Sequence, residues 1–285
     1  GGHAQMPWRF IRSLGLRNGL FYTIRNVLNA LQMRTSARVR RAAKRADVLI
    51  AATEADRRAM SRIHRKEAVL KHEQGAASLQ HSHDRRPPLS PNRPFRLGWC
   101  GRFLPGKQIP IALRAVAIAS RTVALELNII GDGRQRVAWQ RLSRQIGVER
   151  ISRWWGKVEH DRALEVIADN DCMLLTTLQE ATTTVVFEAL ASGLPVICHD
   201  SCGFASVVDD SCGIKIPVVT PRRSVEGFAK AIVTLGKDPE FLARLSAGAF
   251  ARAAEHSWDN KAREMVFMYR QALSSGRATC RAGSA

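Results

Sequence analysis

The 285-residue sequence has no long apolar run, and this absence is the first constraint on its class. A helix that crosses a bilayer needs about 18 to 20 successive apolar residues, and no such segment occurs. The first residues, Gly1-Gly2-His3-Ala4-Gln5, also lack the hydrophobic core that a signal peptide requires. We therefore expect a cytoplasmic protein, with an apolar fraction of 45% that allows sizeable buried cores.

The cysteines do not show the paired C-x-x-C spacing that is typical of zinc sites. Cys198, His199, Cys202 and Cys212 are close in sequence, so zinc binding stays an alternative to reduced, buried thiols. A G-x-G-x-x-G motif is also missing after the first strand that follows the proline-rich segment described below. Its absence argues against a nicotinamide-dependent dehydrogenase.

Acidic residues are scarce relative to basic ones, and the formal net charge is +19. Residues 1–90 carry 18 lysine and arginine residues against 6 acidic ones, so most of the excess lies in the smaller N-terminal part. This field favours acidic partners such as anionic lipid headgroups, nucleic acid or phosphorylated substrates. Basic strands interleaved with aromatic residues are missing, so we do not expect nucleic acid to be the partner.

The N-terminal part reads as basic amphipathic helices followed by a short α/β segment. Apolar residues recur at helical spacing over residues 8–33, and a further basic helix is expected over Ser36–Arg45. An apolar strand over Val48–Ala52 then leads to Thr53, a suitable N-cap for the next helix. Residues 76–94 are rich in proline, serine and histidine, which is typical of a linker.

Beyond the linker, short apolar runs alternate with helical patterns. This alternation predicts an α/β domain with a doubly wound parallel sheet over residues 95–257, followed by a C-terminal helix and tail over 258–285. The expected strands are Arg96–Gly101, Leu125–Gly131, Ile151–Gly156, Cys172–Thr177 and Pro195–His199. The expected helices are Pro110–Ser120, Arg134–Ile146, Arg162–Ala168, Val185–Ser192, Ser224–Leu235, Pro239–His256 and Asp259–Leu273.

Two carboxylates eight positions apart, Glu180 and Glu188, bracket a loop of small hydroxyl residues that becomes a helix. A strand that leads through a polar loop into a helix N-terminus can bind an anion through unpaired N–H groups. Glu188 could accept hydrogen bonds from hydroxyl groups of the same ligand. The arrangement suits a sugar nucleotide, although acidic residues near a helix start are also common without any ligand.

In a doubly wound sheet, ligands bind beyond the carboxyl ends of the strands, and other polar elements of this sequence lie there. Arg102 and Lys107 follow the first strand and could hold a diphosphate, or they could be solvated loop charges. Gly131-Asp132-Gly133 is a tight turn into a helix. Gly156, Lys157 and Val158 offer backbone groups where a flat base could lie.

Together the segments GRFLPGK, LNIIGDGR, WWGKV and E-x7-E followed by ALASGLPVI resemble the retaining glycosyltransferases of family 4, in family order and spacing. The resemblance covers about Arg96 to Leu273 and implies a GT-B fold. It implies a nucleotide-sugar donor as substrate, no resident cofactor and no catalytic metal. Residues 1–75 resemble the C-terminal part of a second, Rossmann-like acceptor-binding domain, whose first hundred residues or so we expect to be absent.

The resemblance also assigns roles to individual residues. Arg102 and Lys107 would hold the donor diphosphate as it leaves, and Glu180 would contact the transferred sugar. Glu188 would bind the donor ribose, and Gly156, Lys157 and Val158 would lie near the base. Backbone N–H groups of Thr182, Thr183 and Thr184 would contact the phosphates. These threonines depart from the usual glycine-rich segment, which leaves the loop shape and donor preference open.

The function expected from the resemblance is sugar transfer with retention to a glycan or lipid-linked acceptor, in cell-surface polysaccharide or glycolipid synthesis. The basic helices of residues 8–45 would then dock on the anionic inner face of the plasma membrane, or they form an ordinary solvated surface. Two alternatives stay open: donor binding without turnover, and a basic nucleic-acid-binding protein.

Overall fold

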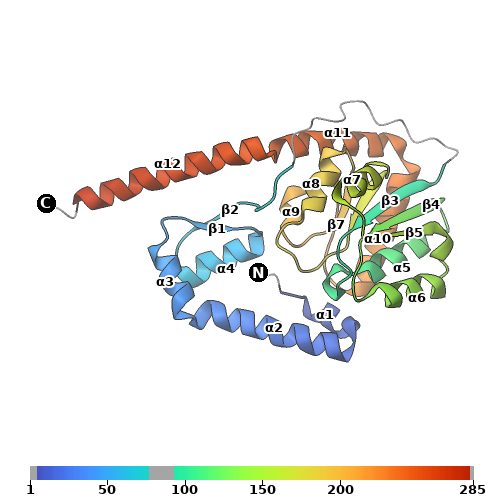
Figure 1. Cartoon of the computed structure of the whole chain (residues 1–285), viewed down its shortest axis with the longest axis horizontal. Coiled ribbons are helices and arrows are strands. Elements are labelled where there is room, and N and C mark those ends of the chain that lie inside the picture. The colour runs from blue at the N-terminus through green and yellow to red at the C-terminus, as the bar shows by residue number, and fades with distance from the viewer. Residues whose placement is uncertain (1–4, 77–92, 283–285) are drawn as a thin grey trace.

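The structure, a computed structural model, describes residues 5–76 and 93–282 (Figure 1). Most of the predicted linker and the end of the predicted tail therefore lie outside the described residues, as do Gly1 and Gly2. The segment before residue 77 consists of three α-helices with a short 3-10 turn, a strand, another helix and a second strand. These elements are α1 (Trp8–Ile11), η1 (Arg12–Leu14), α2 (Gly15–Thr35), α3 (Ala37–Arg45), β1 (Leu49–Ala51), α4 (Glu54–His64) and β2 (Ala68–Leu70).

The rest of the chain is built on a six-stranded sheet in which every neighbouring pair is parallel, in the order β5-β4-β3-β6-β7-β8. The strands are β3 (Phe95–Cys100), β4 (Leu125–Ile130), β5 (Ser152–Gly156), β6 (Cys172–Leu175), β7 (Val196–His199) and β8 (Gly213–Ile216). The strand order reverses between β3 and β6, which confirms the predicted doubly wound architecture.

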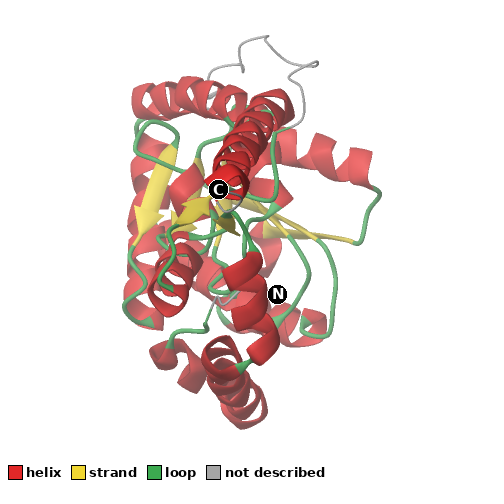
Figure 2. Ribbon diagram, turned by 90° about the vertical axis from the view of Figure 1, so that its left-hand side faces the viewer, coloured by secondary structure: helices red, strands yellow, loops and turns green. Residues whose placement is uncertain are grey.

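Helices cover both faces of this sheet (Figure 2). One face carries α5 (Ile109–Ala119), α6 (Arg136–Gln145) and α10 (Pro221–Lys237), and the other carries α7 (His160–Ala168), α8 (Thr184–Ala191), α9 (Phe204–Val207) and α11 (Pro239–Glu255). Each layer buries its own apolar cluster against the sheet. Phe10 and Tyr22 from the N-terminal helices belong to the first of these clusters.

The N-terminal segment carries a small α/β unit of its own. The Thr53 hydroxyl accepts a hydrogen bond from Asp56 N at 3.0 Å, so the predicted N-cap of α4 is present. Strands β1 and β2 pair in parallel, with Leu49 and Ala68 buried against Ala43 of α3. The helix α12 (Trp258–Ala282) runs out from the sheet domain above this unit (Figure 1), and Lys71 beyond β2 pairs with Glu264 on α12 at 2.6 Å.

The observed elements agree with the predicted ones to within a few residues at most boundaries. The prediction missed β8, because Gly213–Ile216 is only four residues long and lies at the sheet edge. It also ended the last helix at Leu273, whereas α12 continues to Ala282. In the part of the chain that the structure describes, no helix is both long and apolar enough to cross a membrane.

Candidate active site

Hydrogen bonds join the loops that leave β3, β4 and β5 at the carboxyl edge of the sheet. Gly101 N donates to Ile130 O at 3.0 Å, and Gly131 N donates to Gly156 O at 2.8 Å. Gly131 has a φ of +124°, and a Cβ atom placed on it would lie 2.0 Å from Gly101 O. Only glycine fits there, so the sequence at this turn fixes a close approach of two loops.

Aromatic rings pack beneath these loops. Phe103 contacts Trp99, Trp139 and Trp154 at centroid distances of 5.3 to 5.9 Å. The buried indole of Trp99 donates to the Thr176 hydroxyl at 3.1 Å, and this hydroxyl donates to Lys107 O at 2.8 Å. The backbone at Lys107 is therefore tied to the ends of both β3 and β6.

Lys107 and Glu180, predicted from separate motifs, form an ion pair. Lys107 Nζ lies 2.5 Å from Glu180 Oε2, and the two side chains are 13% and 26% exposed. Arg102, the other predicted cation, is exposed at the mouth of the same loop. The structure thus places a cation and a carboxylate in direct contact at the carboxyl edge of β3 and β6.

The threonine loop forms the entrance to α8. The side chains of Thr182 and Thr183 are buried, whereas Thr184 is exposed and its hydroxyl hydrogen-bonds the Glu188 carboxylate. Thr182 N donates to Glu73 Oε1 at 2.7 Å, a contact from the N-terminal segment that the sequence analysis did not anticipate. The loop therefore lies where the N-terminal segment and the sheet domain meet.

Glu188 lies one turn into α8, and burial raises its pKa above the ordinary value, while the nearby His160 opposes this shift. Burial also raises the pKa of the Cys100 thiol to about 12, with a further increase from the charge of Glu188 and a decrease from that of Lys107. Cys100, Lys107 and Glu188 thus share one electrostatic environment. Cys100 is therefore an uncharged thiol in the site and not a thiolate nucleophile.

The end of β5 carries the third predicted group. Gly156 has a φ of +72°, and a Cβ atom there would lie 3.7 Å from the guanidinium of Arg136. Arg136 also pairs with Asp132 at 3.0 Å, four residues earlier. Lys157 is exposed and Val158 is partly buried, so a flat group could lie against the backbone here beside Arg136. Sequence reasoning missed Arg136, because its place beside Gly156 depends on the turn after β5.

His199, the histidine of the predicted cysteine and histidine cluster, is a buried side chain with two hydrogen-bond partners. The His199 ring lies 3.0 Å from Thr176 O through Nδ1 and 2.9 Å from the Ser224 hydroxyl through Nε2, and burial lowers its pKa to about 4. Both ring nitrogens are thus engaged. Among residues 5–76 and 93–282, no group of three or more histidine, cysteine, aspartate or glutamate side chains could hold a metal ion.

One Asp-x-Asp pair, Asp169 and Asp171, precedes β6 at the opposite, amino-terminal edge of the sheet. Arg93 binds Asp171 with two hydrogen bonds of 2.7 Å, and Arg96 pairs with Asp169 at 2.8 Å. These carboxylates join the starts of β3 and β6 and lie far from the loops described above.

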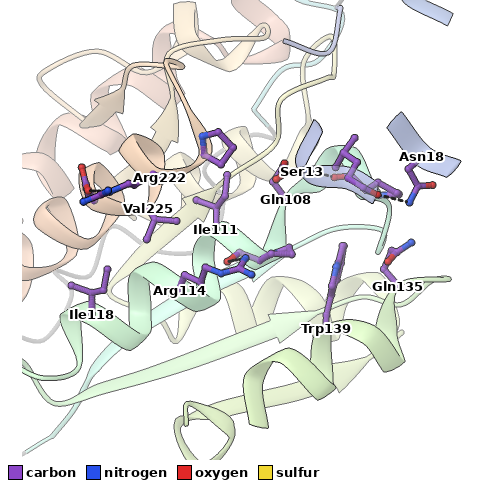
Figure 3. Close-up of a pocket in the computed structure, with 15 residues that line it drawn as sticks. Ser13, Asn18, Gln108, Ile111, Arg114, Ile118, Gln135, Trp139, Arg222 and Val225 are labelled. Atoms are coloured by element: carbon purple, nitrogen blue, oxygen red, sulfur yellow. Dashed lines mark hydrogen bonds and ion pairs between the residues drawn. The ribbon is translucent and has the colours of Figure 1, made fainter. Parts of the chain in front are cut away.

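A groove of 670 Å³ lies outside this constellation, between η1, α2 and the helices α5, α6 and α10 (Figure 3). Ile111, Trp139 and Val225 line it together with the polar side chains of Gln108 and Gln135. None of the predicted site residues lines the groove. We place the candidate site at the strand ends, because charged groups from several motifs converge there and not in the groove.

The sheet domain matches a known protein family. The model of a family described as "Glycosyl transferases group 1" matches residues 94–238, which include every predicted site residue. The chain belongs to the group 1 glycosyltransferases. The match covers half of the chain and excludes the N-terminal segment.

Curated relatives of this glycosyltransferase domain include D-inositol 3-phosphate glycosyltransferases. The protein of Streptomyces griseus is 27% identical over 194 residues, which are 65% of this chain and 40% of the relative. That of Saccharomonospora viridis is 26% identical over 193 residues, 64% of this chain and 44% of the relative. The chain thus aligns with less than half the length of these relatives.

Solved glycosyltransferase structures share the GT-B fold with the chain. The pneumococcal O-GlcNAc transferase GtfA, solved with UDP and GlcNAc, superposes with a TM-score of 0.68 at 19% identity over 83% of this chain and 47% of GtfA. Anabaena HepE, solved with UDP, also gives 0.68 at 18% identity, over 86% of this chain and 68% of HepE. The GT-B class predicted from the sequence is confirmed.

Proposed function

We propose that this chain binds a nucleotide diphosphate sugar at the carboxyl edge of its sheet and transfers the sugar with retention, as a family 4 enzyme. The observation that carries the proposal is that the Lys107–Glu180 ion pair and Glu188 lie at the same edge of the sheet, where the charges of Lys107 and Glu188 both act on the Cys100 thiol. Solved neighbours that contain UDP support the ligand class. D-inositol 3-phosphate glycosyltransferases among the relatives support a hydroxylated acceptor.

In this proposal, the bond between the sugar C1 and the donor diphosphate breaks, and the diphosphate leaves with the electron pair. The acceptor oxygen bonds to C1 on the same face, and its proton passes to the departing phosphate. Lys107, Arg102 and the backbone N–H groups of residues 182–184 stabilise the negative charge on the diphosphate, the Thr182 N–H once its present carboxylate partner has left. The reaction involves no resident cofactor or metal.

The other predicted residues bind the two ends of the donor. Glu180 contacts the transferred sugar, and Glu188 accepts hydrogen bonds from the ribose hydroxyls. Gly156, Lys157 and Val158 contact the base, with Arg136 beside them.

Calorimetric titration with UDP, GDP and ADP tests the donor site. We expect one nucleotide to bind, and Arg102→Ala or Glu188→Ala to weaken it about tenfold to 150-fold, the effect of losing a charged hydrogen bond. Arg121→Ala, an exposed arginine in the loop before β4, is the matched control. If no nucleotide binds the wild-type chain or any of its variants, the proposal is wrong.

Turnover distinguishes transfer from donor binding alone. A chain that binds a nucleotide and releases it from the matching sugar donor, in the presence of a glycan or lipid-linked acceptor, is a transferase. The anomeric proton coupling of the product, measured by NMR, reports retention. Nucleotide binding without product would favour the alternative of a donor-binding module.

We further propose a cytoplasmic location with peripheral docking on an anionic membrane, through α2. Leu16, Leu20, Ile24 and Leu28 follow one another at helical spacing on its exposed side, and Leu16 is 96% exposed. Residues 1–46 contain ten basic residues and no acidic one. An apolar stripe with a wholly basic surround is complementary to an anionic lipid surface, and a lipid-linked acceptor would be within reach there.

Vesicle sedimentation tests the docking surface. We expect binding to phosphatidylglycerol vesicles that falls with added salt, and no binding to phosphatidylcholine vesicles. The substitutions Leu20→Ser and Ile24→Ser should abolish binding, whereas Val137→Ser at an exposed position of α6 should not. Equal sedimentation of all variants, or none with the wild-type chain, would refute the docking.

A further inference from the structure

The backbone N–H of Thr182 is engaged by a carboxylate from a distant segment. Glu73, which follows β2, places Oε1 2.7 Å from Thr182 N, across 109 positions of sequence. Thr182 itself is buried, whereas the Glu73 side chain is exposed. An anionic group therefore occupies one of the loop amides that the proposed function assigns to the donor.

A second carboxylate forms an ion pair with the neighbouring cation. Glu180 Oε2 lies 2.5 Å from Lys107 Nζ, the side chain assigned to the diphosphate. The two contacts are alike: in each, a carboxylate of the protein binds an N–H group that an anionic ligand also needs. Since a phosphate oxygen and a carboxylate oxygen compete for the same N–H groups, ligand binding must displace or share them.

The segment that carries Glu73 is held on both sides. Lys261 Nζ on α12 donates to His72 O at 2.6 Å, and Ala76 N donates to His256 O at 2.9 Å. The His72 ring lies 3.4 Å from the hydroxyls of both Thr182 and Ser206. The backbone of residues 72–76 is thus fixed against the sheet domain, and the exposed carboxylate at its edge is the part that can swing away.

We propose that Glu73 is an internal competitor that gates donor binding: its carboxylate holds the Thr182 amide until the anionic part of the donor replaces it. This inference rests on the proposed donor site and concerns the regulation of that site.

Titration of the full chain with UDP, GDP, ADP and inorganic pyrophosphate tests the gate. Glu73→Ala frees the amide and removes the charge, and Glu73→Gln removes the charge but keeps an acceptor oxygen. We expect Glu73→Ala to tighten binding about tenfold and Glu73→Gln to tighten it less. Glu264→Gln is the control, because it removes one negative charge beside Lys71 without touching the loop.

The outcomes separate the gate from the donor site. If a nucleotide binds the wild-type chain but binds Glu73→Ala equally or more weakly, Glu73 only supports the loop and the gate is wrong, while the donor site stands. If only Glu73→Ala binds a nucleotide or pyrophosphate, the gate is supported. If no variant binds any of the four probes, both the gate and the donor site are wrong.

Hydrogen exchange of the peptide that contains Thr182 gives a second readout. In Glu73→Ala, the gate predicts faster exchange of the Thr182 amide than in the wild-type chain, and renewed protection when pyrophosphate is added. Exchange that pyrophosphate does not slow in Glu73→Ala, at concentrations that saturate the titration, would overturn the competition between the two anions.

Discussion

Replacement of Thr176 with valine is the sharpest test of how the site is built. The Thr176 side chain is fully buried, and its hydroxyl accepts from Trp99 Nε1 at 3.1 Å and donates to Lys107 O at 2.8 Å. Valine keeps the shape and removes both hydrogen bonds. The buried indole N–H and the Lys107 carbonyl are then both left without this partner.

The expected cost follows from these two groups. A buried polar group left unsatisfied costs about 1 to 3 kcal/mol, so Thr176→Val, which leaves two such groups, should lower the free energy of unfolding by about 2 to 6 kcal/mol. Urea unfolding followed by circular dichroism measures it. Thr234→Val, at an exposed position of α10, should change stability by no more than about 0.5 kcal/mol.

A double-mutant cycle isolates the indole contact. In a Trp99→Phe background the N–H donor is gone, so Thr176→Val should cost only about 1 to 3 kcal/mol, from the Lys107 carbonyl alone. The coupling between the two substitutions is the free energy of the indole contact. If Thr176→Val is no more destabilising than the Thr234→Val control, the chain of hydrogen bonds from β3 through β6 to Lys107 does not stabilise the site, and this reasoning is refuted.

Three further changes test other parts of the site. Lys107→Met should weaken nucleotide binding about tenfold to 150-fold in calorimetry, because a charged contact to the diphosphate is lost; unchanged affinity would remove Lys107 from the donor site. Glu188→Gln should raise the free energy of unfolding at neutral pH: burial raises the pKa of Glu188, so its stabilising effect is complete below the ordinary glutamate pKa of about 4.3 and is lost as the pH rises through the folded value. The wild-type and Glu188→Gln curves of stability against pH should therefore converge in acid, and parallel curves would contradict the sign. Gly131→Ala should prevent the loops after β3 and β4 from meeting, because its Cβ atom would lie 2.0 Å from Gly101 O; an unchanged melting temperature and nucleotide affinity would show that the close approach is dispensable.

Periodicity was enough to predict the sheet domain, because buried parallel strands are short apolar runs and the helices between them carry apolar stripes. The positions of Lys107, Glu180 and Glu188 at one sheet edge followed from the same rule, since parallel strands all end on that side. The ion pair between Lys107 and Glu180 could not be predicted in this way, because a separation of 73 residues in the sequence gives no indication of a 2.5 Å contact.

Glu73 and Arg136 could not be found in this way for a different reason. Glu73 lies outside the matched family region and reaches the loop only because the segment after β2 packs against the sheet domain. Arg136 looked like one of many surface arginines, and only the turn geometry at Gly156 brings it to the end of β5. Contacts between segments that are distant in sequence depend on the packed fold and not on local pattern.

The two acidic contacts of the site differ in how readily they open, and this difference determines where affinity can change. Lys107 is held by a buried hydrogen bond to Thr176, so its partner Glu180 faces a cation whose backbone is fixed. Glu73 is an exposed side chain with one hydrogen bond to the loop, and its release costs about 1.4 kcal/mol, the equivalent of the tenfold change expected for Glu73→Ala. A site held on rigid strand ends keeps its geometry when one flexible contact changes. Substitutions at residue 73 should therefore alter nucleotide affinity without altering the stability of the sheet domain, whereas substitutions at Thr176 should alter both.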